Sequence, residues 1–297
     1  MSSQLDRLRA LTKNLKMKAE HDLSGNEKFT KVITVASGKG GVGKTNFTLN
    51  LGLALAEFGQ RVLILDADLG LANIDVILGV SPKFNLYHVI NGEKDIADII
   101  LEGPNGIKII PGGSGISELA DLKEWELERF LLKLSSLEKE SDYLLIDTGA
   151  GISKSVLNFT LAADEIIVIT TPEPTSLTDA YGLIKTLNKH KYIGVIKLVI
   201  NKAIDYEEGE IAANKLKIVV SRFLKNCKLE IFGFILDDKA VPLAVKKQQP
   251  FLLDSPTSKA ADGIYSLASK MCNQLYETNQ ANGLKDYFYK IVSFFKT

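Results

Sequence analysis

The chain has 297 residues, and its 45% hydrophobic content can bury one large α/β core or two smaller ones, which excludes a disordered protein. Thirty-six basic residues balance 36 acidic residues, so the overall charge excludes a general attraction to nucleic acid. The two cysteines, Cys227 and Cys272, lie far apart and disfavour a disulfide framework, a zinc site or a cysteine-ligated cluster.

The N-terminal part, residues 1–30, is predicted to hold a short helix and a linker. Residues 2–19 carry leucines on one helical side with arginines and lysines elsewhere, and the polar segment 21–28 follows. These residues lack the continuous apolar stretch of a secretory signal, and no run of about 18 apolar residues occurs anywhere. We therefore expect a cytoplasmic protein that does not span a membrane.

Residues 31–278 alternate between apolar runs and helix-like segments. The apolar runs predict strands at residues 32–37, 62–66, 107–111, 143–147, 166–171, 196–201 and 231–236. Helical spacing is found between them, at residues 45–58, 124–140, 176–190 and 210–225. This alternation predicts an α/β fold with a doubly wound, mainly parallel sheet and helices on both faces. Ligands of such sheets bind at the carboxyl ends of the strands.

Residues 38–45 read GKGGVGKT between a predicted strand and a predicted helix, which is the full P-loop pattern. The glycines let successive backbone N–H groups converge on phosphate oxygens, and the helix N-terminus adds positive charge. Lys44 is expected to neutralise the outer phosphates, and the Thr45 hydroxyl to ligate Mg²⁺. The predicted nucleotide contacts are Gly38, Lys39, Gly40, Gly41, Val42, Gly43, Lys44, Thr45 and Asn46.

Carboxylates follow two of the predicted strands. Asp66 ends the predicted strand at 62–66 and Asp68 follows it, while Asp147 ends the strand at 143–147. Phosphoryl transfer needs one carboxylate near Mg²⁺ and one group that orients the attacking water, so these acids are candidates for both tasks. Two glycines after Asp147, at positions 149 and 151, would let this segment move when the γ-phosphate is lost.

Asn201, at a predicted strand end, resembles the adenine-reading position of the MinD and ParA ATPases, and the segment 242–248, which begins with Pro242, is expected to cover the other side of the base. A guanine site would be expected to read Asn-Lys-x-Asp, but Asp205 lies one place too far along the chain. The sequence therefore favours ATP over GTP.

The run from Lys39 to Thr45 resembles the deviant Walker A loop of the MinD and ParA ATPases. The resemblance implies that Lys39 reaches the phosphates of the opposite subunit, so that ATP closes a homodimer. It also implies that Asp68 positions water, that Asp147 belongs to the metal shell, and that Asp66 assists both. The alternative for Lys39 is a solvated lysine beside an anion site.

The C-terminal part, residues 279–297, begins with a turn-rich NQANG break and continues as an amphipathic helix over 284–296. Its apolar stripe is formed by Leu284, Tyr287, Phe288, Ile291, Val292, Phe294 and Phe295, opposite a basic face. Such a helix can lie in the headgroup region of an anionic membrane, as in the resembling MinD branch, which implies reversible attachment to the inner face of the cell membrane. The alternative is a stripe that packs onto the domain.

Residues 3–11, SQLDRLRAL, resemble the N-terminal segment of the FlhG (YlxH) family, and residues 66–79, 85–90 and 147–153 are also similar to it. The resemblance implies a regulator of flagellar number and placement that stimulates an FlhF-type GTPase through Gln4, Leu8 and Arg9. Flagellar C-ring proteins are a further implied class of partner, whereas specific nucleic acid is not expected. A MinD-type division-site regulator and a ParA-type DNA-partitioning scaffold remain alternatives.

Overall fold

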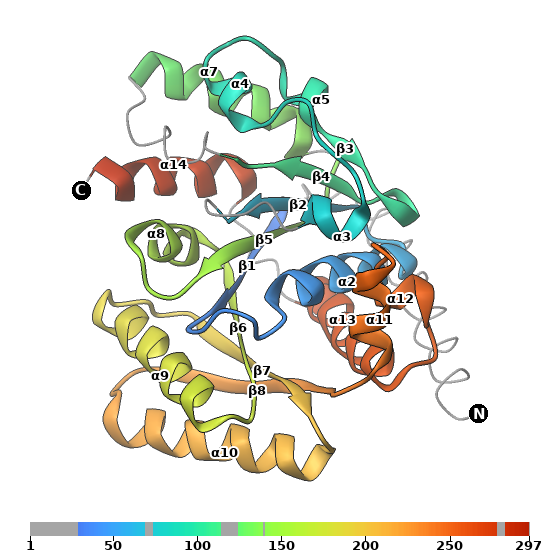
Figure 1. Ribbon diagram of the computed structural model, residues 1–297. Coiled ribbons are helices and arrows are strands. Elements are labelled where there is room, and N and C mark those ends of the chain that lie inside the picture. The colour runs from blue at the N-terminus through green and yellow to red at the C-terminus, as the bar shows by residue number, and fades with distance from the viewer. Residues whose placement is uncertain (1–28, 69–73, 114–123, 139, 278–282, 297) are drawn as a thin grey trace.

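The computed structural model describes residues 29–68, 74–113, 124–138, 140–277 and 283–296. One sheet of eight strands forms its centre, in the order β3-β4-β2-β5-β1-β6-β7-β8 (Figure 1). The strands are β1 (Lys31–Ser37), β2 (Val62–Ala67), β3 (Leu101–Glu102), β4 (Lys108–Pro111), β5 (Tyr143–Ala150), β6 (Glu165–Thr170), β7 (Val195–Ala203) and β8 (Lys228–Leu236). Every pairing is parallel except that of β3 with β4. The predicted doubly wound, mainly parallel α/β fold is confirmed.

One face of the sheet is covered by α2 (Lys44–Glu57) and α13 (Lys259–Glu277), with α11 (Ala240–Lys246) and α12 (Phe251–Asp254) beside them (Figure 1). Helix α2 is apolar around most of its circumference, and its residues from Phe47 to Leu55 are buried. A helix of this kind belongs in the interior of a domain, because no side of it is left for water. The P-loop therefore connects two buried elements, β1 and α2.

In the described part of the chain, the long helices on the opposite face are α7 (Glu124–Glu138), α8 (Lys154–Ala162), α9 (Pro174–Lys189), α10 (Tyr206–Phe223) and α14 (Gly283–Lys296). Their amphipathic spacing turns leucine, isoleucine and aromatic side chains onto the strands. Asp205 is the N-cap of α10, where its Oδ1 accepts a hydrogen bond from the Glu208 N–H at 2.8 Å. This acid is therefore used in helix capping and does not line the nucleotide cavity described below.

The connection from β2 to β4 carries short elements at the edge of the sheet. They are α3 (Ile74–Leu78), α4 (Leu86–Ile90), α5 (Ile96–Ile99), β3 and the 3₁₀ helix η1 (Pro104–Gly106). Asn85 caps α4, since its side chain accepts a hydrogen bond from the Tyr87 N–H at 3.1 Å. These elements set the path of the chain after Asp68 and so bound one side of the nucleotide cavity, through α3.

Helix α14, red in Figure 1, lies between α7 and α8 and belongs to the hydrophobic core. Tyr287 and Phe288 are each 1% exposed; the Tyr287 hydroxyl donates to the Phe159 carbonyl at 3.2 Å, and the Phe288 ring meets that of Phe130 edge-on with centroids 5.6 Å apart. The other buried members of the stripe are Leu284, Ile291 and Val292, with Phe294 partly buried.

The apolar stripe of α14 therefore takes the alternative position, on the domain. Five of its side chains, Leu284, Tyr287, Phe288, Ile291 and Val292, are buried there, because the seat formed by α7, α8 and β1 offers them an apolar surface. The Glu138 carboxylate holds the start of the helix: Oε2 accepts from the Leu284 N–H and Oε1 from the Thr30 N–H, both at 2.6 Å. The side chain of Phe295 lies outside the described residues.

Candidate nucleotide site

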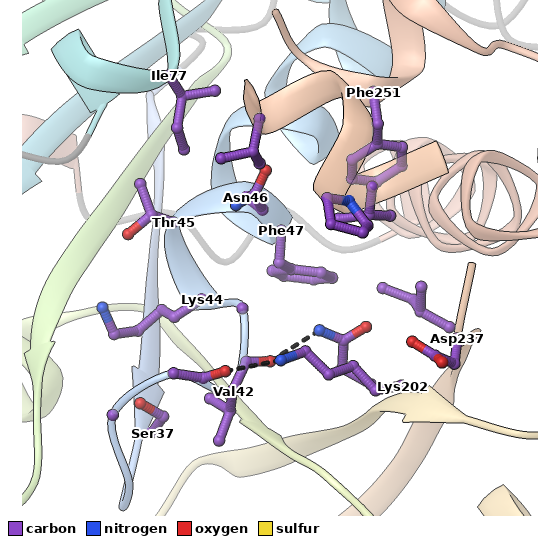
Figure 2. A pocket seen from close by; sticks show the side chains of 18 of the residues that line it. Ser37, Val42, Lys44, Thr45, Asn46, Phe47, Ile77, Lys202, Asp237 and Phe251 are labelled. Carbon is purple, nitrogen blue, oxygen red and sulfur yellow. Dashed lines mark hydrogen bonds between the residues drawn. The ribbon is translucent and has the colours of Figure 1, made fainter. Parts of the chain in front are cut away.

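A cavity of about 760 Å³ lies at the carboxyl ends of the central strands, between the P-loop, the end of β7 and helix α11 (Figure 2). Most of the residues predicted to bind nucleotide line it: Lys39, Gly40, Gly41, Val42, Gly43, Lys44, Thr45, Asn46, Asp68, Asn201 and Pro242. Gly38 does not line the cavity but packs against α9, where a Cβ would stand 2.2 Å from the Asp179 carbonyl oxygen. Only glycine fits that close approach.

Lys44 is the buried lysine of the P-loop, with a relative exposure of 7%. Its Nζ donates to Asp147 Oδ1 at 3.1 Å and to the Thr148 carbonyl oxygen. The preceding Gly43 is the N-cap of α2, with a left-handed φ of 93° that glycine adopts without strain. The lysine thus lies at a helix N-terminus, the position from which it can reach the outer phosphates of a nucleotide.

Asp147 is fully buried behind Lys44. Its Oδ1 accepts from Lys44 and, at 3.5 Å, from the Thr48 hydroxyl, whereas Oδ2 has no hydrogen-bond partner among the residues that the structure describes. Burial raises the pKa of Asp147, and the opposing effects of Lys44 and the nearby Thr45 hydroxyl do not cancel it. An unsatisfied buried carboxylate oxygen next to a hydroxyl is a donor set that suits Mg²⁺. Thr45 and Asp147 would hold the ion, which neutralises phosphate charge during transfer.

Asp66 and Asp68 differ in position. Parallel pairing of β2 with β5 sets Asp66 beside Asp147. The Asp66 carboxylate accepts from the Asp68 N–H at 3.2 Å and from the Ile74 N–H at 3.3 Å, so it shapes the segment that contains Asp68. Asp68 lines the cavity, but Asp66 does not. Of the two acids, Asp68 is thus the one that can touch a nucleotide or a water molecule beside it.

Lys39 lines the cavity and also contacts the start of α9. Its Nζ donates to Glu173 Oε2 and to the Thr175 hydroxyl, both at 3.0 Å, at the start of α9. The lysine side chain is 38% exposed and the Glu173 side chain is 65% exposed. Water therefore screens their attraction, and the ion pair is weak.

Asn201 and Lys202, at the end of β7, hold the P-loop from the base side. The Asn201 Nδ2 donates to the Val42 carbonyl at 2.7 Å, and the Lys202 Nζ donates to the Gly41 carbonyl at 2.8 Å. Asn201 therefore contacts the loop, in addition to lining the cavity where a base would lie. Lys202 was not among the predicted residues, since a lysine that follows a strand is ordinarily a solvated side chain.

Gln4, Leu8 and Arg9 fall outside the described residues. The apolar stripe of α14 lies on the face covered by α7 and α8, away from the cavity-lining residues. Among the helices of the described ranges, none is both long enough and apolar enough to cross a bilayer.

Known proteins resemble this chain over most of its length. The profile of the AAA domain family matches residues 30–201. The antiactivator FleN of Pseudomonas aeruginosa is 40% identical over 262 residues, covering 88% of this chain and 93% of FleN. The flagellum site-determining protein YlxH of Helicobacter pylori is 34% identical over 302 residues, covering 99% of each chain.

A solved structure resembles the fold as well. The septum site-determining protein MinD of Pyrococcus horikoshii, in complex with Mg-ADP, superposes with a TM-score of 0.64 at 26% identity, covering 82% of this chain and 96% of that one. That structure holds Mg-ADP, and in this chain the P-loop, Lys44 and Asp147 have the charges and donor atoms that suit ATP and Mg²⁺. The chain belongs to the MinD/ParA-type family of deviant Walker A, P-loop ATPases.

Proposed function

We propose that the protein is a slow regulatory ATPase, organised as an activator segment (1–30), an ATPase domain (31–278) and a membrane-targeting helix (279–297). The observation that supports ATP hydrolysis is the pair of acidic residues at strand ends beside the P-loop. Asp68 lines the cavity and would orient the attacking water, while Asp147 holds a cation at its buried carboxylate. Lys44 would leave Asp147 for the phosphates when a nucleotide enters, and Thr45 and Asp147 would hold Mg²⁺, which supplies neutralisation of phosphate charge.

A homodimer is the second part of the proposal. Lys39 is partly exposed at the rim of the cavity, and its ion pair with Glu173 is solvent-screened, so little holds the ammonium in place. A second copy that carries ATP would offer this lysine a triphosphate in a site shielded from water, where charge pairing is stronger. ATP would thereby close the dimer, and hydrolysis would open it.

Membrane attachment through α14 is the third part. Its stripe is buried on the domain, so the helix has to leave its seat before these side chains contact lipid. One short helix binds a membrane weakly, whereas a dimer that presents two gains avidity. The test is co-sedimentation with anionic vesicles in the presence of ATP: Phe295→Glu should bind less than the unaltered protein, and equal binding would contradict this part.

The biological output that we propose is control of flagellar number and placement. The flagellum site-determining protein YlxH of Helicobacter pylori, which matches 99% of this chain, supports this assignment. The segment 2–19, with Gln4, Leu8 and Arg9, would stimulate an FlhF-type GTPase, with Arg9 stabilising phosphate charge. Flagellar C-ring proteins are proposed as further partners. A synthetic peptide of residues 1–20 should accelerate GTP hydrolysis by such a GTPase, and an Arg9→Ala peptide should not.

A MinD-type regulator of the division site is the second candidate, favoured by the likeness to the MinD fold. The two candidates differ in the partner that they need. Deletion of the gene from a flagellated host should change the number or position of flagella if the first proposal is right, and the position of septa if the second is right. A ParA-type scaffold would instead bind duplex DNA in a salt-sensitive way and ignore vesicles.

Hydrolysis and dimerisation are tested by two substitutions. Asp68→Ala should keep an ATP-bound dimer and abolish turnover, because it removes the group that orients water. Lys44→Ala should lose both, because it removes the main phosphate-binding cation. Light scattering after size exclusion, together with phosphate release, measures the two properties. The same oligomeric state for both variants with ATP would contradict the mechanism.

A further inference from the structure

Two consecutive side chains of β7 hold two consecutive carbonyls of the P-loop. The Lys202 Nζ donates to the Gly41 carbonyl at 2.8 Å, and the Asn201 Nδ2 donates to the Val42 carbonyl at 2.7 Å; dashed lines mark these hydrogen bonds in Figure 2. Neighbouring residues of a regular strand point to opposite faces of the sheet. Some departure from regular geometry therefore lets both side chains reach one loop.

That departure is an irregularity in the pairing of β7 with β8. Ile200 pairs with Phe234, but Ala203 pairs with Leu236, so β7 contains one residue more than β8 in this interval. A bulge of this kind redirects side chains and is common beside functional sites. Lys202 has a φ of 58°, in the left-handed region that a lysine seldom adopts. The backbone is therefore held in an unfavourable conformation at the residue whose ammonium contacts the loop.

The geometry of the peptide bond gives this contact a consequence for phosphate binding. In a trans peptide the C=O and the following N–H point in opposite directions. A hydrogen bond that holds the Gly41 carbonyl toward Lys202 directs the Val42 N–H the other way, and the bond from Asn201 does the same for the Gly43 N–H. A carbonyl turned toward the phosphates would repel them, whereas N–H groups attract them.

We propose that Lys202 is a positioning residue of the P-loop, which orients the Val42 N–H for nucleotide phosphates. Asn201 does the same for the next peptide unit. The role concerns nucleotide binding by a single chain, so it does not depend on hydrolysis, dimerisation or a membrane. Without the lysine, the peptide unit between Gly41 and Val42 can rotate. Phosphate binding then has to order this peptide unit, which lowers the affinity.

The test is the affinity for Mg-ATP of a Lys202→Asn variant, measured by calorimetry with Asp68→Ala as the background to prevent turnover. Asparagine tolerates a left-handed backbone, so the substitution removes the ammonium without adding backbone strain. The matched control is Lys191→Asn, since Lys191 is an exposed lysine with a φ of 59° that does not line the cavity. We expect Lys202→Asn to bind Mg-ATP about three- to tenfold more weakly, because one hydrogen bond is lost. The affinity of the control should not change.

Repeating the titration at about 1 M salt separates positioning from long-range attraction, because exposed charges are then screened beyond about 3 Å. If Lys202 positions the loop, the difference in nucleotide affinity between Lys202→Asn and the Asp68→Ala background should persist at high salt, for ADP as well as ATP. Equal affinities at low salt, or a difference that disappears at high salt, would overturn the proposal. Failure of the unaltered protein to hydrolyse ATP would instead count against the proposed function and leave this inference intact.

Discussion

At the scale of single residues, the site is organised around Asp147. Burial raises the pKa of this carboxyl, which means that its charged form depends on a cation beside it. Lys44 supplies that cation here, 3.1 Å from Oδ1, while Oδ2 is left without a hydrogen bond in the part of the chain that is described. The pair is therefore ready to exchange one cation for another when Lys44 moves to the phosphates.

An Asp147→Asn variant should bind ATP with much less dependence on Mg²⁺, because the carboxylate that attracts the ion is gone. We expect the gain in ATP affinity on adding Mg²⁺ to fall by about 10- to 100-fold, as measured by calorimetry with and without the metal. Asp142→Asn is the control, since Asp142 is equally buried but pairs with Arg61 at 2.8 Å. An unchanged Mg²⁺ dependence for Asp147→Asn would remove Asp147 from the metal shell.

At the scale of elements, the decisive feature is the seat of α14. The stripe that suits a membrane also fits α7 and α8, and in this structure it is buried there. Docking on the domain and the proposed insertion into lipid would bury the same side chains, so the two states would compete. A change in the seat that leaves α14 itself unaltered should shift this competition.

Phe130→Ala on α7 removes the ring that packs against Phe288 and should loosen α14. We expect the free energy of unfolding in urea to fall by about 3 kcal/mol, because a buried ring is lost. Vesicle binding without ATP should increase, because α14 leaves its seat more easily. Leu132→Ala is the control on the same helix, because Leu132 is 68% exposed and should change neither property. Vesicle binding that does not rise in Phe130→Ala would mean that the seat does not restrain α14.

A second prediction at this scale concerns the buried ion cluster of β1, β6 and β7. Glu165 contacts Lys31 and, at 2.7 Å, Lys197, and both lysine side chains are almost fully buried. Burial acts to raise the pKa of Glu165, but the two ammonium groups outweigh it and lower the pKa below its ordinary value of 4.5. The cluster therefore stabilises the fold above pH 4.5, and this stability is lost as the pH falls through the lower folded-state pKa.

Glu165→Gln should cost about 3 kcal/mol at pH 7, because it leaves two buried ammonium groups without their carboxylate. The cost should shrink in urea titrations carried out at progressively lower pH, where the unaltered protein loses the same charge. Glu140→Gln, which breaks an exposed pair with Lys108 at 2.5 Å, should cost less than about 1 kcal/mol. Equal costs for the two substitutions would show that burial does not govern the cluster.

At the scale of the whole molecule, the proposed switch couples three distant regions: the cavity, the dimer face that carries Lys39, and α14. The coupling requires that vesicle binding follow the dimer and not ATP alone. Lys39→Ala should bind ATP nearly as well as the unaltered protein but remain monomeric and attach weakly to anionic vesicles. The dimer should bind more tightly by avidity, about 10²-fold or more. A monomeric Lys39→Ala that binds vesicles fully would uncouple the two events.

The sequence by itself determined the fold class, the P-loop and its acids, because these depend on local periodicity and on spacing within one strand–loop–helix unit. It also predicted the long strands and several long helices, although α8, α11, α12, α13 and the short elements between β2 and β4 were not predicted. Only the tertiary structure decided where α14 packs, since its stripe suits lipid and protein equally well.

The role of Lys202 was likewise decided by the tertiary structure. A bulge that depends on the pairing of β7 with β8 turns this lysine onto the Gly41 carbonyl, far away in the chain. Local sequence cannot encode such a contact on its own, because it arises from the register between two strands and from the loop that they approach.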